Sequence, residues 1–135
     1  MNLTIDQFIQ NAIEEDIAQV GDITTLATIP ANQIGQAHFL VKEQCMIAGV
    51  EMAIRIAQKI DPSVQIDFQV QDSDIVDQQT TICSIKGSIH SILLAERLML
   101  NCMQRMSGIA TKVNRLKKMI TDYPAQILDT RKTTP

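Results

Sequence analysis

Residues 88–106 read SIHSILLAERLMLNCMQRM, the longest stretch of the sequence in which apolar side chains recur at helical spacing. Isoleucine, leucine, methionine and cysteine fill most of its positions, so we expect a helix that is buried nearly all round. Ser107 and Gly108 then interrupt the pattern, and residues 109–120 are expected to continue as a second, more basic helix. The elements on either side of this long helix set the fold class.

Shorter elements precede the long helix. Apolar and polar residues alternate from Val64 to Val70, which predicts the clearest half-buried strand of the chain. The other expected elements are a helix that starts at the capping box Thr4–Gln7 and stops at Gly21, an irregular polar segment over 24–30, strands over 37–41 and 45–48, a helix over 50–60, and a strand over 80–86 that Gly87 closes.

After the second helix, residues 126–128 predict a short apolar strand that runs directly into the polar run 129–134. The order helix, strands, helix, strands, helices, strand is typical of an α+β domain with a mainly antiparallel sheet, followed by the start of a second unit. We therefore expect an α+β domain over residues 1–108. A connecting helix and the first strand of a truncated second domain would occupy residues 109–135.

Composition narrows the class of protein. A net charge of -3 argues against nucleic acid or an anionic membrane as the main partner, because both attract a clustered positive field. Cys45, Cys83 and Cys102 follow no CxxC pattern, so reduced thiols are expected rather than a zinc site or disulfides. His38 and His90 stand alone, without metal-ligand spacing.

The first ten residues do not resemble a signal peptide and no apolar run could span a bilayer, so we expect a cytoplasmic protein.

A polar stripe within the long helix is the first candidate for chemistry. Arg97, Asn101 and Gln104 share one face, with Arg105 at its edge. In one interpretation Arg97 pairs with a core carboxylate while the two amides bond backbone carbonyls. In the other, the planar fork of an arginine binds a carboxylate or phosphate through two parallel hydrogen bonds.

The second candidate is the run Asp129-Thr130-Arg131-Lys132-Thr133, which follows a predicted strand. Barrels and open α/β sheets place their ligands at such strand ends, and adjacent arginine and lysine could hold two negative groups of one substrate. A solvated turn is the alternative interpretation of the same residues.

Four segments together resemble the quinolinate phosphoribosyltransferase family. They are Glu15-Asp16 with Gly21-Asp22-Ile23-Thr24-Thr25, Lys42-Glu43 with Ala48-Gly49, the helix segment from Ala95-Glu96-Arg97 to Ser107-Gly108-Ile109-Ala110-Thr111, and Leu128-Asp129-Thr130-Arg131-Lys132-Thr133. They stand in the family's order and span the whole chain.

The resemblance implies an α/β-hammerhead-like N-terminal domain followed by the first strand of an incomplete α/β barrel. It implies an enzyme that converts quinolinate and phosphoribosyl pyrophosphate to nicotinate mononucleotide, pyrophosphate and CO₂ with Mg²⁺, in a homodimer whose subunits share their sites. Arg97 would reach the neighbouring subunit's site, while Thr130, Arg131 and Lys132 would contact substrate. The Mg²⁺ ligands would lie in the rest of the barrel, so the 135 residues are expected to be inactive alone.

One segment departs from the family pattern, since residues 71–79 contain no glycine where the family usually has a glycine-rich turn. This bears on the turn's geometry rather than on function. Three alternatives stay open: a phosphoribosyltransferase for nicotinate or another pyridine acid, the related decarboxylating enzyme of molybdenum-associated gene clusters, and a non-enzymatic module that dimerises or binds a small acid.

Overall fold

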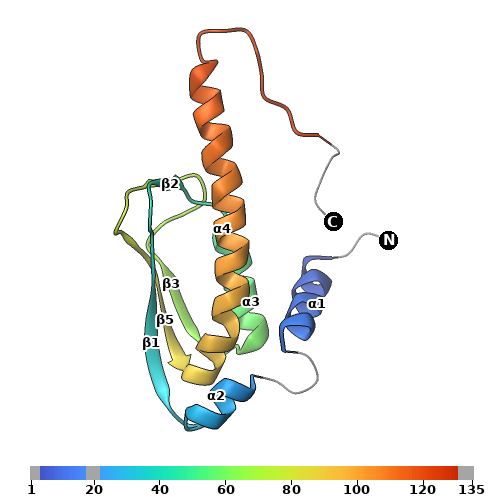
Figure 1. Cartoon of the computed structure of the whole chain (residues 1–135), viewed down its shortest axis with the longest axis vertical. Coiled ribbons are helices and arrows are strands. Elements are labelled where there is room, and N and C mark those ends of the chain that lie inside the picture. Colours follow the sequence, from blue (N-terminus) through green and yellow to red (C-terminus); the bar gives the residue numbers. More distant parts are fainter. Residues whose placement is uncertain (1–3, 18–21, 131–135) are drawn as a thin grey trace.

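The computed structural model describes residues 4–17 and 22–130. The elements in chain order are α1 (Ile5–Ile17), α2 (Ile23–Thr28), β1 (Ile34–Leu40), β2 (Cys45–Met46), α3 (Val50–Ile60), β3 (Gln65–Phe68), β4 (Ile75–Val76), β5 (Thr81–Ser88) and α4 (Ile89–Met119). Figure 1 shows the strands on one side of the molecule and the helices α3 and α4 on the other, with α2 near the start of α4. The fold is α+β with antiparallel sheets, as expected.

The main sheet has the order β1-β5-β3, and both pairings are antiparallel. β5 is therefore the central strand, with Ile34 opposite Ser88 on one side and Gln65 opposite Lys86 on the other. β2 and β4 form a separate two-stranded sheet. α4 packs against β1, β5 and β2, and α3 packs against α4 and β3.

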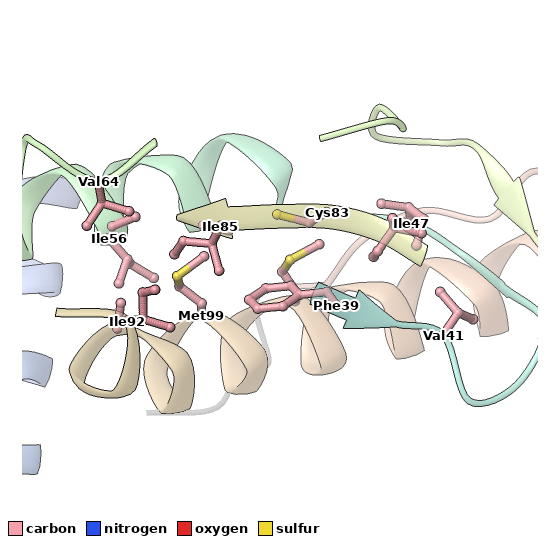
Figure 2. Packing of buried hydrophobic residues seen from close by; sticks show 14 of the residues in the cluster. Phe39, Val41, Ile47, Ile56, Val64, Cys83, Ile85, Ile92 and Met99 are labelled. Atoms are coloured by element: carbon pink, nitrogen blue, oxygen red, sulfur yellow. The ribbon is translucent and has the colours of Figure 1, made fainter. Parts of the chain in front are cut away.

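The core lies between the main sheet and the two helices. Figure 2 shows Cys83 and Ile85 of β5 together with Ile92 and Met99 of α4 and Ile56 of α3, and all five side chains are buried. Burial raises the pKa of the Cys83 thiol to about 12, which keeps it protonated and unreactive at neutral pH. All three cysteines are free, as the sequence predicts.

The segment 24–30 is not irregular, because α2 occupies Ile23–Thr28. Asp22 caps this helix: its carboxylate accepts hydrogen bonds from the Thr25 backbone N–H, at 3.0 Å, and from the Thr25 hydroxyl. The helix ends before Pro30, where Ile29 is extended. The expectation failed because the cap outweighs the weak helix propensity of the threonines. The expected stop at Gly21 lies outside the described residues.

The interruption expected at Ser107 and Gly108 is also absent, since α4 runs unbroken for 31 residues. Only one of its faces is buried, so the expectation of burial all round was wrong. That face consists of Ile92, Ala95, Met99, Met103 and Ser107. Good helix formers follow Gly108, and Lys117 and Lys118 in the last turn suit the helix dipole.

Two loops differ from the sequence expectations as well. Residues 126–128 form no strand in the described structure, because a strand needs a hydrogen-bonded neighbour and this segment has no pairing there. Residues 71–79 turn without glycine by placing Ser73 and Gln79 at φ 81° and 68°, and they contain the unpredicted strand β4. The backbone N–H of Gln79 donates to the Val41 carbonyl at 2.8 Å, which holds this left-handed residue in place.

Candidate functional site

The polar stripe of α4 lies on the surface. Arg97, Asn101 and Gln104 are exposed, so the interpretation in which Asn101 and Gln104 belong to a buried network does not apply. Arg97 donates from Nη1 to Oδ1 of Asp16 at 3.0 Å, across from α1. The Arg97 side chain is 72% exposed and the Asp16 side chain 29% exposed, so the carboxylate sits deeper than the guanidinium that it holds.

The surroundings of this pair form a small polar hollow between α1 and α4. It encloses about 430 Å³ and is lined by Ala12, Glu15, Asp16, Arg97, Leu98 and Asn101. Asp22 at the start of α2 also lies in the field of Arg97. Hydrogen bonds from Thr25 are the main reason that the pKa of Asp22 is lowered, and the Arg97 charge adds a smaller part.

A second set of contacts joins β2 and the start of α3 to the middle of α4. The Ser107 hydroxyl accepts from Ala48 N at 3.0 Å and donates to Ala48 O at 3.2 Å. The Thr111 hydroxyl accepts from Met46 N at 2.9 Å. Gly49 has φ 98°, and a Cβ there would lie 3.0 Å from Sδ of Met106. The Ala48-Gly49 segment and the Ser107–Thr111 segment are therefore one structural contact.

A larger cleft of about 660 Å³ opens beside this contact, between the β1–β2 connection and the second half of α4. Its floor is apolar, with Phe39, Ile82 and Met103 among its lining residues. Lys42, Lys112 and Arg115 also line it. The cleft can take an apolar group that carries negative charge, but it lies apart from the Arg97 hollow, with which it shares no lining residue.

The family model for the quinolinate phosphoribosyl transferase N-terminal domain matches residues 22–107, which include α2 to β5, Arg97 and Ser107. The chain belongs to the quinolinate phosphoribosyltransferase family. Two of the segments that carry the family resemblance, Asp22–Thr25 and Ala48–Gly49, are explained structurally by the Asp22 cap and by the close approach of Gly49 to α4.

Relatives of this family align along nearly all of the chain. It is 45% identical over 129 residues to quinolinate phosphoribosyltransferase [decarboxylating] 1b of Nicotiana tabacum, covering 94% of this chain and 36% of the relative. It is 43% identical to the chloroplastic nicotinate-nucleotide pyrophosphorylase [carboxylating] of Arabidopsis thaliana, with the same coverage. The chain thus spans little more than a third of the length of these curated relatives.

Solved structures of the family share the fold. The nicotinate-nucleotide pyrophosphorylase of Francisella tularensis superposes with a TM-score of 0.90 at 34% identity, covering 97% of this chain and 46% of that one. The Streptococcus pyogenes NadC structure gives a TM-score of 0.92 at 30% identity, covering all of this chain and 49% of that one. The α+β domain is therefore the N-terminal domain of this family's enzymes. The division into 1–108 and 109–135 stays a prediction.

The other predicted site residues of this family member lie beyond α4. Thr130 is exposed in the extended segment that turns back from the end of α4 (Figure 1). Its backbone N–H donates to Oδ1 of Asp129 at 2.7 Å. Arg131 and Lys132 lie outside the described residues. The structure brings Arg97 together with Asp16 of α1.

The described residues offer no metal site, since no three His, Cys, Asp or Glu side chains among them gather closely enough to hold an ion. The described residues therefore do not fit Mg²⁺. Within residues 4–17 and 22–130, none of the helices combines the length and the apolar character that crossing a bilayer requires.

Proposed function

We propose that the protein to which this chain belongs transfers a phosphoribosyl group to quinolinate and removes one of its carboxylates as CO₂. A ring nitrogen–carbon bond forms as pyrophosphate leaves, and a proton replaces the lost carboxylate, which gives nicotinate mononucleotide. The observation that carries this proposal is the family match over residues 22–107. Two relatives whose names state this chemistry align over 94% of the chain and support it.

Arg97 is proposed as a carboxylate-binding residue. Its side chain is 72% exposed and is bonded by one nitrogen to Asp16, so the rest of the guanidinium can receive a second anion. A guanidinium that binds an anion in this way gives two parallel hydrogen bonds and keeps its charge at every working pH. Thr130, Arg131 and Lys132 are proposed as further substrate contacts, with Thr130 adding a hydrogen bond.

The subunits are proposed to form a homodimer in which Arg97 completes the neighbour's site. The second half of α4 supports this, because it leaves an apolar face exposed in the described structure. That face consists of Ile109, Val113, Leu116 and Met119.

Mg²⁺ is proposed as the cofactor, bound by residues outside this chain. The cytoplasm is proposed as the site of action, with the three free thiols in keeping with a reducing compartment.

Replacement of Arg97 tests the proposal in the product of the intact gene. Arg97→Ala should raise the KM for quinolinate on the order of a hundredfold, because the substrate loses a charge-assisted bidentate contact. The thermal midpoint should stay within a few degrees of the wild-type value. Arg55→Ala is the matched control, because Arg55 also contacts an α1 carboxylate, Asp6 at 3.9 Å, and pairs with Glu51 at 2.6 Å, but it lines neither the hollow nor the cleft.

The pyridine acid that receives the phosphoribosyl group distinguishes the proposed function from its alternatives. Quinolinate should be consumed with CO₂ release, and nicotinate should not be used. An unchanged KM for quinolinate in Arg97→Ala would remove Arg97 from the site, and preference for nicotinate would favour the enzyme for a monoacid.

A further inference from the structure

Asp16 occupies a position that the stability of its own helix does not explain. It lies in the last turn of α1 together with Glu14 and Glu15, and that turn contains no basic residue. The carbonyl end of a helix carries partial negative charge, so a carboxylate there is unfavourable for the helix. A role outside α1 is needed to account for it.

The geometry supplies such a role. Asp16 reaches across to α4 and accepts a hydrogen bond from Nη1 of Arg97 at 3.0 Å, between residues 81 positions apart. The carboxylate is the more sheltered partner, at 29% exposed against 72% for the arginine. Asp16 therefore binds the guanidinium on the side that faces the protein, and the side that faces outward stays accessible to solvent.

The hollow around the pair is itself unsuited to an anion. Glu15 and Asp16 line it with two negative charges against the single positive charge of Arg97. A substrate carboxylate would be repelled from inside the hollow and must approach the outward side of Arg97. Asp22, at the start of α2, does not line the hollow; hydrogen bonds from Thr25 are the main reason that its pKa is lowered, and the Arg97 charge adds a smaller part.

We propose that Asp16 is a positioning residue for substrate binding: it holds the Arg97 guanidinium in the orientation in which its outward nitrogens receive a carboxylate of the pyridine diacid. A long, exposed arginine side chain otherwise samples many rotamers, and each binding event must then restrict them. The inference rests on the proposed function, since it assumes that Arg97 binds quinolinate.

The test uses the full-length protein and steady-state kinetics. Asp16→Asn removes the charge but keeps the shape, and it should raise the KM for quinolinate roughly tenfold. The turnover number and the KM for phosphoribosyl pyrophosphate should stay within about twofold. Asp16→Glu keeps a carboxylate at this position, so its KM for quinolinate should be much closer to the wild-type value than that of Asp16→Asn. Glu14→Gln is the matched control: it removes the same charge from the same turn, where Glu14 bonds only Gln10 among the described residues.

Two further readouts separate positioning from a structural role. The thermal midpoint of Asp16→Asn should be unchanged or higher, because an unfavourable charge leaves the helix end. In the Arg97→Ala background, Asp16→Asn should have no further effect on the KM for quinolinate. A lowered midpoint of Asp16→Asn, or an additive effect on the KM in the double variant, would overturn the inference. So would an Asp16→Asn variant whose KM for quinolinate equals that of Glu14→Gln.

Failure of this inference is distinguishable from failure of the proposed function. A wild-type protein that turns over quinolinate, combined with a silent Asp16→Asn, overturns the role of Asp16 alone. A wild-type protein that does not turn over quinolinate overturns both.

Discussion

Two hydrogen-bonded carboxylates link the stability of the domain to pH. The pKa of Asp61 is lowered by the hydroxyl of Ser63 first, then by the hydroxyl of Ser91, while Thr25 lowers the pKa of Asp22. A lowered folded-state pKa means that the ionised form stabilises the fold. This contribution is complete above the unfolded-state pKa of about 4 and is lost as pH falls through the folded-state value.

The Asp61 cluster allows a direct test of that sign. Ser63→Ala removes the first donor, so the pKa of Asp61 should rise toward its ordinary value in a carboxyl NMR titration. The variant should lose stability relative to wild type at pH 6, and the difference should shrink below about pH 4. A difference that grows on acidification would contradict the assignment.

Local contacts of single residues could be predicted, and distant ones could not. The capping box Thr4–Gln7 was predicted and is confirmed, with both reciprocal bonds present at 2.9 and 3.2 Å. Its partners lie three positions apart, so sequence spacing specifies them. Arg97 pairs with a carboxylate, as one interpretation predicted, but at the surface rather than in the core, and no periodicity indicates Asp16, which is 81 positions away.

The long helix α4 contains one glycine, Gly108, and no close contact among the described residues requires a glycine there. A Cβ at Gly108 would meet no atom within 4 Å among the described residues, whereas Gly49 has φ 98° and a Cβ there would lie 3.0 Å from Sδ of Met106. Glycine in an exposed helix interior costs about 1 kcal/mol relative to alanine. The two positions therefore form a matched pair for the same substitution.

Gly108→Ala should raise the free energy of unfolding by about 0.5–1 kcal/mol, and Gly49→Ala should lower it by more than that. Denaturant unfolding of both variants measures the contrast. Destabilisation by Gly108→Ala would mean that another part of the whole protein packs against this point of α4.

Elements with a clear period were predicted best. The helix over 50–60 matches α3 residue for residue, and the strand over 64–70 is present but shorter, as Gln65–Phe68. α2 was missed because its stability comes from one capping side chain rather than from a period. The two-residue strand β4 has no pattern of its own and exists only through pairing with β2.

The exposed second half of α4 bears on how a second subunit could complete the proposed substrate site. α4 extends beyond the sheet in Figure 1, and its second half exposes Ile109 at 60% and Met119 at 74%. An apolar helix face of this kind suits contact with another subunit. The proposed homodimer would place Arg97 of one subunit beside Arg131 and Lys132 of the other.

A shared site predicts complementation between two variants that each have little activity at quinolinate concentrations near the wild-type KM. When Arg97→Ala and Arg131→Ala subunits are mixed at equal amounts and allowed to exchange, half of the dimers are hybrids, each with one intact site. About a quarter of the wild-type activity should return. Absence of recovery after exchange has been verified by mass would show that each site is built from one chain.

The most direct test of the proposed function is CO₂ release from carboxyl-labelled quinolinate by the intact gene product, with phosphoribosyl pyrophosphate and Mg²⁺. Release of CO₂ should require both substrates and should equal the amount of nicotinate mononucleotide formed. A folded protein that releases no CO₂ under these conditions would contradict it and would favour a non-enzymatic module.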